Sequence, residues 1–91
     1  MNTFPLRIVT PDGPVFEGEV SIVNMRSRIG AFGVMANHAP MIVACPPGAL
    51  RARDGADRDI VFDCDHCVFT MDGTTATVLT AFAHAVTLPK E

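Results

Sequence analysis

Short apolar segments alternate with turn signals along this 91-residue chain. In the first segment, Leu6, Ile8 and Thr10 point one way and Arg7 and Val9 the other, which is the period of two that is typical of a β-strand. No window of about 11 residues carries an apolar stripe with helical spacing. The pattern therefore predicts strands rather than helices, at residues 6–10, 15–25, 33–35, 41–45, 49–53, 60–62, 68–71, 76–80 and 84–88.

The turn signals between these segments indicate the fold class. They are rich in Gly, Pro, Asp and Asn, and they lie at residues 10–14, 27–33, 36–40, 46–48, 53–57 and 71–75. Short strands at near-even spacing, joined by such turns, indicate an all-β fold, either an antiparallel sandwich or a barrel. The sequence has no linker, internal repeat or low-complexity segment, so we expect a single domain over residues 1–91.

The composition narrows the class of protein. Hydrophobic residues make up 48% and charged residues 19% of the chain, which is typical of a globular domain. A net charge of −3 with only 7 Lys and Arg argues against nucleic-acid binding, which requires clustered basic residues. No apolar run reaches the roughly 18 residues of a membrane span, and the N-terminus lacks the pattern of a secretory signal. Three cysteines cannot all pair within one chain, so we expect reduced thiols in a cytosol-like compartment.

His38 stands in the segment Asn-His-Ala-Pro, between two apolar stretches. Nucleophilic catalysis would need a Ser or Cys, such as Cys45, together with this histidine and an orienting carboxylate. The sequence offers no strained nucleophile turn and no Gly-rich oxyanion loop. A turn is the favoured interpretation, because Asn37 accepts a left-handed conformation and Pro40 holds Ala39 extended. We expect His38 to be a polar turn or contact residue, with catalysis through Cys45 as the alternative.

The segment Asp-Cys-Asp-His-Cys at 63–67 contains soft ligands at a spacing seen in metal sites. A structural zinc site usually has four protein ligands, however, and no second Cys/His pair stands at a matching distance. Redox chemistry of the thioredoxin type requires such a motif at the start of a helix, whereas strand-like segments flank it here. On a strand, Cys64 and His66 would face one side and Cys67 the other. We expect buried strand cysteines and no metal or cofactor, with a metal-binding or thiol-redox module as the alternative function.

Several motifs, in order along the chain, resemble one known family. They are Phe16-x-Gly18-x-Val20, then Gly30, Gly33 and Val34 followed by His-Ala-Pro-Met-Ile at 38–42, then Pro-Pro-Gly-Ala-Leu at 46–50, and Ala-Thr-Val-Leu-Thr-Ala-Phe-Ala at 76–83. Together they resemble the epsilon subunit of the F-type ATP synthase over essentially the whole chain.

The resemblance implies a small antiparallel β-sandwich of about ten short strands in the central stalk of that complex. Such a subunit catalyses no reaction. It would bind the gamma subunit along one side and the polar loops of the c-ring with its lower end, and so couple ion-driven rotation to ATP synthesis. It would lie at the cytoplasmic face of the bacterial inner membrane, peripherally and without inserting into the bilayer.

The same resemblance implies which residues meet the ring. The His-Ala-Pro turn and the segment 26–33 are expected to lie together at the ring-facing end. The expected ring-contact residues are Arg28, Ile29, Ala31, Phe32, His38, Ala39 and Pro40, and the expected turn-forming residues are Gly30, Gly33, Asn37 and Gly48.

The chain departs from the family pattern at four places. Ala36-Asn37 replaces the usual Pro-Gly before His-Ala-Pro, and the turn is expected to survive because asparagine can replace glycine at a positive φ. Ala31 stands where an acidic residue is common, and Arg26 and Arg28 precede it, so Arg28 is expected to be the attractive group at the ring. The pair His66-Cys67 replaces a Gly-Gly. Family members usually continue into a two-helix hairpin that carries the ATP response and inhibits hydrolysis. This sequence ends before such a hairpin, and its Met start leads us to expect a naturally short subunit.

Overall fold

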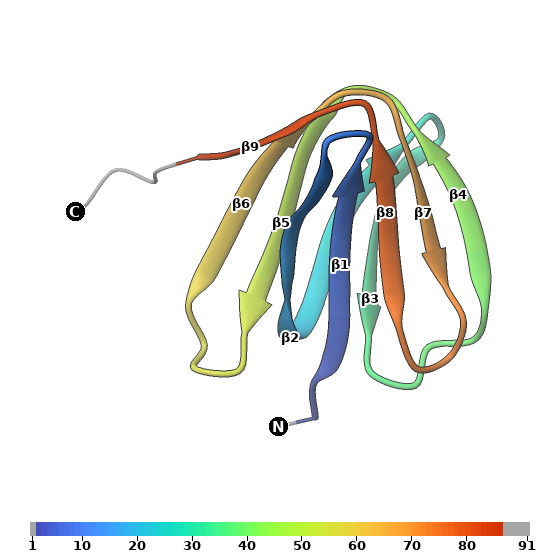
Figure 1. The fold of residues 1–91 in the computed structure, drawn as a ribbon. Coiled ribbons are helices and arrows are strands. Elements are labelled where there is room, and N and C mark those ends of the chain that lie inside the picture. Colours follow the sequence, from blue (N-terminus) through green and yellow to red (C-terminus); the bar gives the residue numbers. More distant parts are fainter. Residues whose placement is uncertain (1, 87–91) are drawn as a thin grey trace.

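All regular structure that the computed structural model describes, within residues 2–86, is β-strand (Figure 1). The structure describes residues 2–86. Its strands are β1 (Phe4–Thr10), β2 (Gly13–Ser27), β3 (Gly30–Met35), β4 (Met41–Cys45), β5 (Gly48–Asp54), β6 (Asp59–Cys64), β7 (Cys67–Met71), β8 (Ala76–Thr80) and β9 (Ala83–Ala85). This part of the chain contains no helix that could span a membrane.

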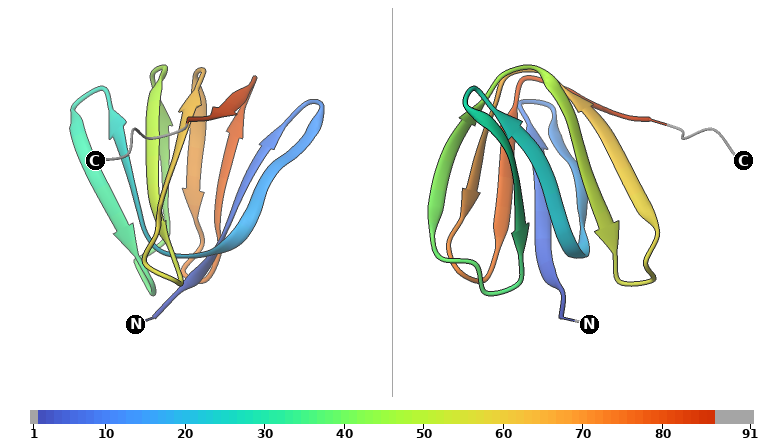
Figure 2. Two further views of the ribbon diagram at one scale, coloured as in Figure 1. Left: turned by 90° about the vertical axis from the view of Figure 1, so that its left-hand side faces the viewer. Right: turned by 180° about the vertical axis from the view of Figure 1, so that it is seen from behind.

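The strands form one sheet that folds over on itself into two layers (Figure 2). Its order is β4-β7-β8-β1-β2-β5-β6-β9, and β3 also pairs with β2. The 15-residue strand β2 pairs with β1 along its first half and with β3 and β5 along its second half, so it belongs to both layers. A register shift between Val20 and Ile22 accompanies the bend, as expected of a β-bulge.

We call β4, β7, β8, β1 and the first half of β2 the first layer. The second half of β2, with β3, β5, β6 and β9, forms the second layer. The core between the layers contains Leu6, Ile8 and Phe69 from the first and Val23 and Leu50 from the second, all of them at most 1% exposed. Burial of such side chains is the main force that holds the two layers together.

The structure confirms the predicted all-β sandwich. Residues 2–86 contain 9 strands, against the expected number of about ten. Seven of the eight strand pairs are antiparallel, whereas β1 and β8 are parallel. Of the predicted segment 84–88, the structure places residues 84 and 85 in β9, and residues 87 and 88 lie outside the described residues.

The two turns that flank the bent strand β2 lie at the same end of the sandwich, and from β3 onward successive connections lie at alternate ends (Figure 1). One end, which we call the Arg28 end, is at the top of Figure 1 and contains the turns at 11–12, 28–29, 46–47, 65–66 and 81–82. The opposite end, which we call the His38 end, contains the connections at 36–40, 55–58 and 72–75. This division decides which of the expected site residues can act together.

Candidate docking surfaces

The structure places the expected ring-contact residues at two opposite ends of the sandwich. Arg28 and Ile29 form the turn between β2 and β3, whereas His38, Ala39 and Pro40 lie in the connection between β3 and β4. The six-residue strand β3 runs between the two connections. At a rise of about 3.3 Å per residue, it separates them by roughly 16 Å. The expectation that these residues form one surface is therefore wrong.

Three expected site residues lie within β3 itself. Phe32 packs against the core, with its ring centroid 5.7 Å from that of Phe69. The alternation of the strand then points Ala31 and Gly33 outward. Gly33 pairs with Asn24 of β2, and a Cβ atom at this position would lie 2.7 Å from Asn24 Oδ1. Phe32 is therefore a partly buried residue that packs against the core, and Gly33 belongs to a closely packed strand and not to a turn.

The Arg28 end presents a tight hairpin turn. Ser27 pairs with Gly30, which leaves Arg28 and Ile29 as the two loop residues. Ser27 Oγ accepts a hydrogen bond from the backbone N–H of Ile29 (3.3 Å) and donates one to the carbonyl of Gly30 (3.0 Å). Gly30 has a φ of 145°, which residues with a side chain rarely adopt. This geometry leaves Ile29 99% exposed at the tip of the hairpin, next to the charged side chain of Arg28.

At the His38 end, backbone contacts hold the connection after β3. Asn37 adopts a left-handed conformation with a φ of 66°, and the N–H of His38 donates a hydrogen bond to the carbonyl of Met35 at 3.3 Å. His38 Nδ1 lies 2.7 Å from the carbonyl oxygen of Ala39, which orients the exposed imidazole. Gly48, at the Arg28 end, is the first residue of β5 and is not among the residues with a positive φ, so its turn does not depend on glycine.

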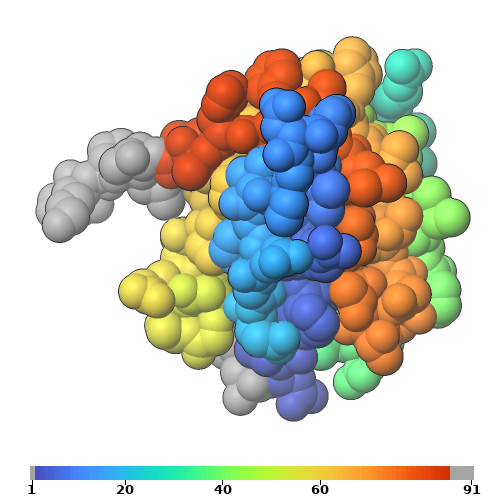
Figure 3. All heavy atoms as spheres, viewed as in Figure 1, coloured from blue at the N-terminus to red at the C-terminus, as the bar shows by residue number. Residues whose placement is uncertain are grey.

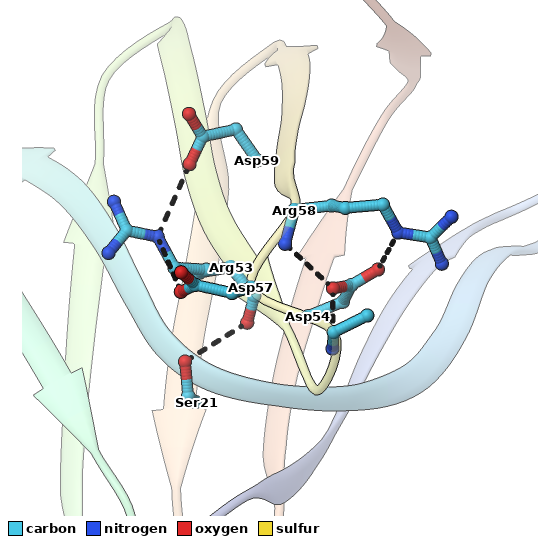
Figure 4. Close-up of polar contacts among 7 residues, drawn as sticks. Ser21, Arg53, Asp54, Asp57, Arg58 and Asp59 are labelled. Carbon is cyan, nitrogen blue, oxygen red and sulfur yellow. Dashed lines mark hydrogen bonds and ion pairs between the residues drawn. The ribbon is translucent and has the colours of Figure 1, made fainter. Parts of the chain in front are cut away.

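The connection between β5 and β6 adds paired charges to the His38 end (Figure 4). Asp54 Oδ1 accepts hydrogen bonds from the backbone N–H groups of Ala56 and Arg58, both at 2.9 Å, and its other oxygen lies 3.1 Å from Arg58 Nε. Arg53 Nε lies 3.4 Å from a carboxylate oxygen of Asp59. The hydrogen bond from the Arg58 backbone is the main cause that holds the pKa of Asp54 below its ordinary value. The carboxylates of this connection therefore bind groups of their own loop.

The outer face of the first layer carries an exposed row of apolar residues. Strand register places Ala44 of β4 opposite Val68 of β7, Val68 opposite Leu79 of β8, and Leu79 beside Val9 of β1. We call these four residues the apolar row. Leu79 is 50% exposed, and Ile42, the next outward residue of β4, is 78% exposed. Figure 3 shows the strands of this face side by side, with β1 in blue, β8 and β7 in orange and β4 in green.

The outer face of the second layer has a different chemistry. Arg53 of β5 lies opposite Asp59 of β6, and Arg51 of β5 lies opposite Asn24 of β2. Asp63 is exposed further along β6. Charged and amide side chains thus lie along β2, β5 and β6 on this face, so the two outer faces suit different kinds of partner.

A groove of about 590 Å³ leads from the apolar row to the turns of the Arg28 end. Arg28 and His66 line it beside the apolar row, together with Cys45 and Cys67. This surface is not among the sites expected from the sequence, although the sequence contains a signal for it. β4 is apolar at its outward positions, Ile42 and Ala44, as well as at its inward ones, which is typical of a strand covered on both faces.

The cysteines gather at the Arg28 end, and all three are buried. Cys64 ends β6, Cys67 begins β7, and Asp65 and His66 form the connection between them. The expectation that the motif follows one strand, with Cys64 and Cys67 on opposite sides, is wrong, because the chain crosses between the layers here and both thiols are buried in the core. The His66 side chain is 72% exposed, and its Nδ1 lies 3.4 Å from Asp65.

Burial and separation of the side chains argue against the alternative functions, which are a metal-binding or thiol-redox module and catalysis by Cys45 with His38. It raises the pKa of Cys64 to about 11 and that of Cys67 to about 12, so both thiols are protonated at neutral pH. Within residues 2–86, no three His, Cys, Asp or Glu side chains are arranged to hold a metal ion. His38 precedes the five-residue strand β4 and Cys45 is its last residue, so the two lie at opposite ends of the sandwich. A general base must lie within hydrogen-bond reach of its nucleophile, so the proposed pairing of His38 with Cys45 is wrong.

Comparisons with known proteins agree with this architecture. The family model described as the β-sandwich domain of the ATP synthase delta/epsilon chain matches residues 3–86. The ATP synthase epsilon chains of Bacillus thuringiensis (strain Al Hakam) and Bacillus mycoides (strain KBAB4) are each 41% identical to this chain over 61 residues, which is 67% of this chain and 46% of the relative. The match thus spans about half the length of these relatives.

Two solved structures share the fold at low sequence identity. A chain of the Euglena gracilis mitochondrial ATP synthase, solved as OSCP/F1/c-ring in rotational state 1, has a TM-score of 0.85 and 16% identity, over 91% of this chain and 53% of that chain. A chain of the Tetrahymena thermophila mitochondrial ATP synthase central stalk and c-ring has a TM-score of 0.75 and 14% identity, over 91% of this chain and 66% of that chain. The family match over residues 3–86, on a sandwich with this strand order, shows that the chain belongs to the family of ATP synthase delta/epsilon chain β-sandwich domains.

Proposed function

We propose that this chain is the β-sandwich of an epsilon-type subunit in the central stalk of an F-type ATP synthase. It binds the gamma subunit and the c-ring, and it couples ion-driven rotation to ATP synthesis without a cofactor and without catalysing a reaction itself. The family match over residues 3–86 is the observation that carries this proposal. The relatives named ATP synthase epsilon chain, and the similar chains solved with a c-ring, support it.

We assign the gamma contact to the apolar row together with Ile42. These residues extend across four neighbouring strands, roughly 15 Å at the usual strand spacing. A contiguous apolar surface is costly to expose to water and is a common mark of a protein–protein interface. The outer face of the second layer lacks such a row, because Arg51, Arg53 and Asp59 lie on it.

We assign the c-ring contact to the Arg28 end. Within residues 2–86 the structure gives Arg28 no ion pair, whereas Arg7, Arg53 and Arg58 lie 2.8, 3.4 and 3.1 Å from carboxylate oxygens. An unpaired cation beside the exposed Ile29 suits a polar ring loop that carries a carboxylate or an amide. The His38 end suits it less, because carboxylates there already accept hydrogen bonds from their own turns. With this end toward the ring, the domain lies peripherally at the cytoplasmic face of a bacterial inner membrane.

Capture by purified partners tests both assignments. Immobilised gamma binds the chain, and the complex of gamma with the chain then binds detergent-solubilised c-rings. We expect Arg28→Glu to weaken ring capture roughly fivefold or more, since an exposed ion pair contributes about 0–1 kcal/mol and the reversed charge adds repulsion. Capture by gamma stays unchanged, because the apolar row is intact.

Two variants serve as controls for Arg28→Glu. Arg51→Glu makes the same charge change on the outer face of the second layer, and His38→Glu places a negative charge at the opposite end. Both leave ring capture unchanged if the Arg28 end faces the ring. Loss of ring capture in His38→Glu, with normal capture in Arg28→Glu, would show that the domain is oriented the other way. Failure of the unmodified chain to bind either partner would refute the function.

A further inference from the structure

Two of the three cysteines are direct neighbours across a strand pair. Cys45 is the last residue of β4, Cys67 is the first residue of β7, and the antiparallel register places them opposite each other. Residues opposite each other in such a pair have Cα atoms about 4.5–5.5 Å apart, which lies within the range of about 4.4–6.8 Å that a disulfide requires. Both side chains are buried in the same core, and each thiol shifts the pKa of the other.

Cys64 is placed differently from this pair. It ends β6, which pairs with β5 and β9 in the second layer, and no backbone ladder joins β6 to β4 or β7. Its separation from Cys67 depends on the Asp65-His66 connection and not on a strand register. Strand register therefore pairs Cys67 with Cys45 and not with Cys64, its neighbour in the sequence motif Cys-x-x-Cys.

The groove at the Arg28 end gives solvent a route to the two neighbouring thiols. Cys45 and Cys67 both line this groove of about 590 Å³, and Cys64 does not. The same groove ends in the turns that carry Arg28 and His66, so it opens at the surface of the molecule. Cys45 and Cys67 are 4% and 5% exposed, and this groove is the route by which we expect a small soluble molecule to approach the pair.

We propose that Cys45 and Cys67 form a reversible disulfide by exchange with a small soluble disulfide of the glutathione type. The first thiolate attacks one sulfur of the small disulfide, forms a mixed disulfide and releases one small thiol. The second protein thiolate then attacks the mixed disulfide and releases the second small thiol. Two protein thiols are oxidised, one small disulfide is reduced to two thiols, and the protein's two protons end on those thiols. This inference rests on the thiol geometry and concerns the free chain, because Arg28 and the apolar row, which belong to the proposed docking surfaces, line the same groove.

The environment of the thiols sets the order and pace of the exchange. Burial raises the pKa of both, to about 12 at Cys67, whereas the hydrogen bond from Cys67 lowers the pKa of Cys45 and partly offsets the effect of burial there. Cys45 is therefore the first nucleophile. Because the thiolate is the reacting form, the exchange is slow at neutral pH and accelerates as the pH rises.

The bond has a structural consequence at the end of the sandwich. β4 is at the margin of the sheet and pairs with β7. A disulfide from Cys45 to Cys67 ties the end of β4 to β7 and closes the segment 45–67 into a loop, which restricts the unfolded chain. We expect the oxidised domain to melt on the order of 10 °C above the reduced domain.

Oxidation of the folded chain tests the proposal. The chain is incubated with oxidised glutathione at about pH 8, the remaining thiols are blocked, and peptides are mapped without reduction. We expect loss of two hydrogens from the intact mass, a cross-linked peptide pair containing Cys45 and Cys67, and a higher melting temperature that dithiothreitol reverses. Cys64→Ala should give the same disulfide, and Cys45→Ala should give none.

The peptide map of the unmodified chain decides the outcome even if a variant folds poorly. A bond between Cys64 and Cys67 as the main product would overturn the proposal. So would mixed disulfides with glutathione that do not resolve, or thiols that react only after denaturation.

Discussion

Two turns of this domain are each held by a single aspartate side chain, whose carboxylate accepts hydrogen bonds from backbone N–H groups of the turn. Asp72 Oδ1 accepts hydrogen bonds from the N–H groups of Thr75 (2.7 Å) and Thr74 (2.8 Å) and from the Thr74 hydroxyl (3.0 Å). These bonds, with that from the Thr75 backbone first, hold the pKa of Asp72 below its ordinary value of 3.8. Asp54 accepts the same kind of bonds in the connection between β5 and β6.

The lowered pKa of Asp72 makes stability depend on pH in one direction. The folded protein binds this proton more weakly than the unfolded chain does. The ionised carboxylate therefore stabilises the fold above the ordinary pKa of 3.8, and this contribution is lost as the pH falls through the folded pKa. We expect Asp72→Asn to be less stable than the unmodified chain at about pH 7, and the difference to shrink between about pH 5 and pH 2. Urea unfolding at a series of pH values measures this difference.

Asp12→Asn is the matched control for this prediction. Asp12 lies in the turn between β1 and β2, at the opposite end, and within residues 2–86 its carboxylate accepts no hydrogen bond, although its backbone N–H donates one to Thr10. Its replacement should change the pH dependence little. If the stability curves of Asp72→Asn and the unmodified chain ran parallel over this range, the role assigned to the Asp72 carboxylate would be wrong.

At the scale of elements, the hairpin of β2 and β3 contains two glycines with different roles. Gly30 has a φ of 145°, and a Cβ atom there would meet nothing within 4 Å, so a side chain costs backbone strain of about 1–3 kcal/mol. At Gly33 a Cβ atom would lie 2.7 Å from Asn24 Oδ1, which is the far end of an exposed side chain that can rotate away. The lower entropy of the unfolded chain offsets part of that cost.

Denaturant unfolding should therefore rank the two alanine substitutions. We expect Gly30→Ala to lower the free energy of unfolding by about 1–3 kcal/mol and Gly33→Ala by less than about 1 kcal/mol. In an Asn24→Ala background, Gly33→Ala should cost nothing further, because the obstructing oxygen is gone. The opposite ranking would mean that close packing, rather than turn conformation, limits this hairpin.

The alternation of apolar and polar residues predicts most of these strands, because each strand buries one face. The predicted segments 41–45 and 76–80 coincide with β4 and β8. The extent of β2, Gly13–Ser27, does not follow from the same signal. The bend near Val20 interrupts the period of two. The residues at both ends of β2 have the composition of turns, and only their pairing with neighbouring strands shows that they belong to the strand.

The expected ring-contact surface is wrong because the sequence alone does not show in which direction the chain runs between its residues. Gly30 and Gly33 are typical turn residues, which makes 27–33 resemble one loop next to His38. Once Gly30–Met35 is a strand, the connections that flank it must lie at opposite ends. Register then points Phe32 into the core. A family resemblance can name contact residues, but the strand pairing decides which of them share a surface.

At the scale of the whole molecule, the sandwich separates two kinds of surface. The apolar row lies on the outer face of the first layer, and the exposed Arg28-Ile29 turn lies at one end. The groove beside Arg28 connects them. One rigid domain can therefore contact an apolar partner along its side and a polar partner at its end, which is the arrangement that transmission of torque between two subunits requires.

Substitution of single residues on the two outer faces tests the assignment of the side. Leu79, on the first layer, is 50% exposed and Met35, on the second, is 60% exposed, so an aspartate at either position should change stability little. We expect Leu79→Asp to weaken capture by gamma at least about tenfold, because it places a charge in the middle of an apolar contact. Met35→Asp leaves capture by gamma unchanged. Both variants should melt within a few degrees of the unmodified chain, which corresponds to a change of about 0.5 kcal/mol in the free energy of unfolding. Equal loss of capture by gamma in the two variants would mean that gamma recognises both faces or an edge between them. Loss of capture in Met35→Asp alone would place the gamma contact on the second layer.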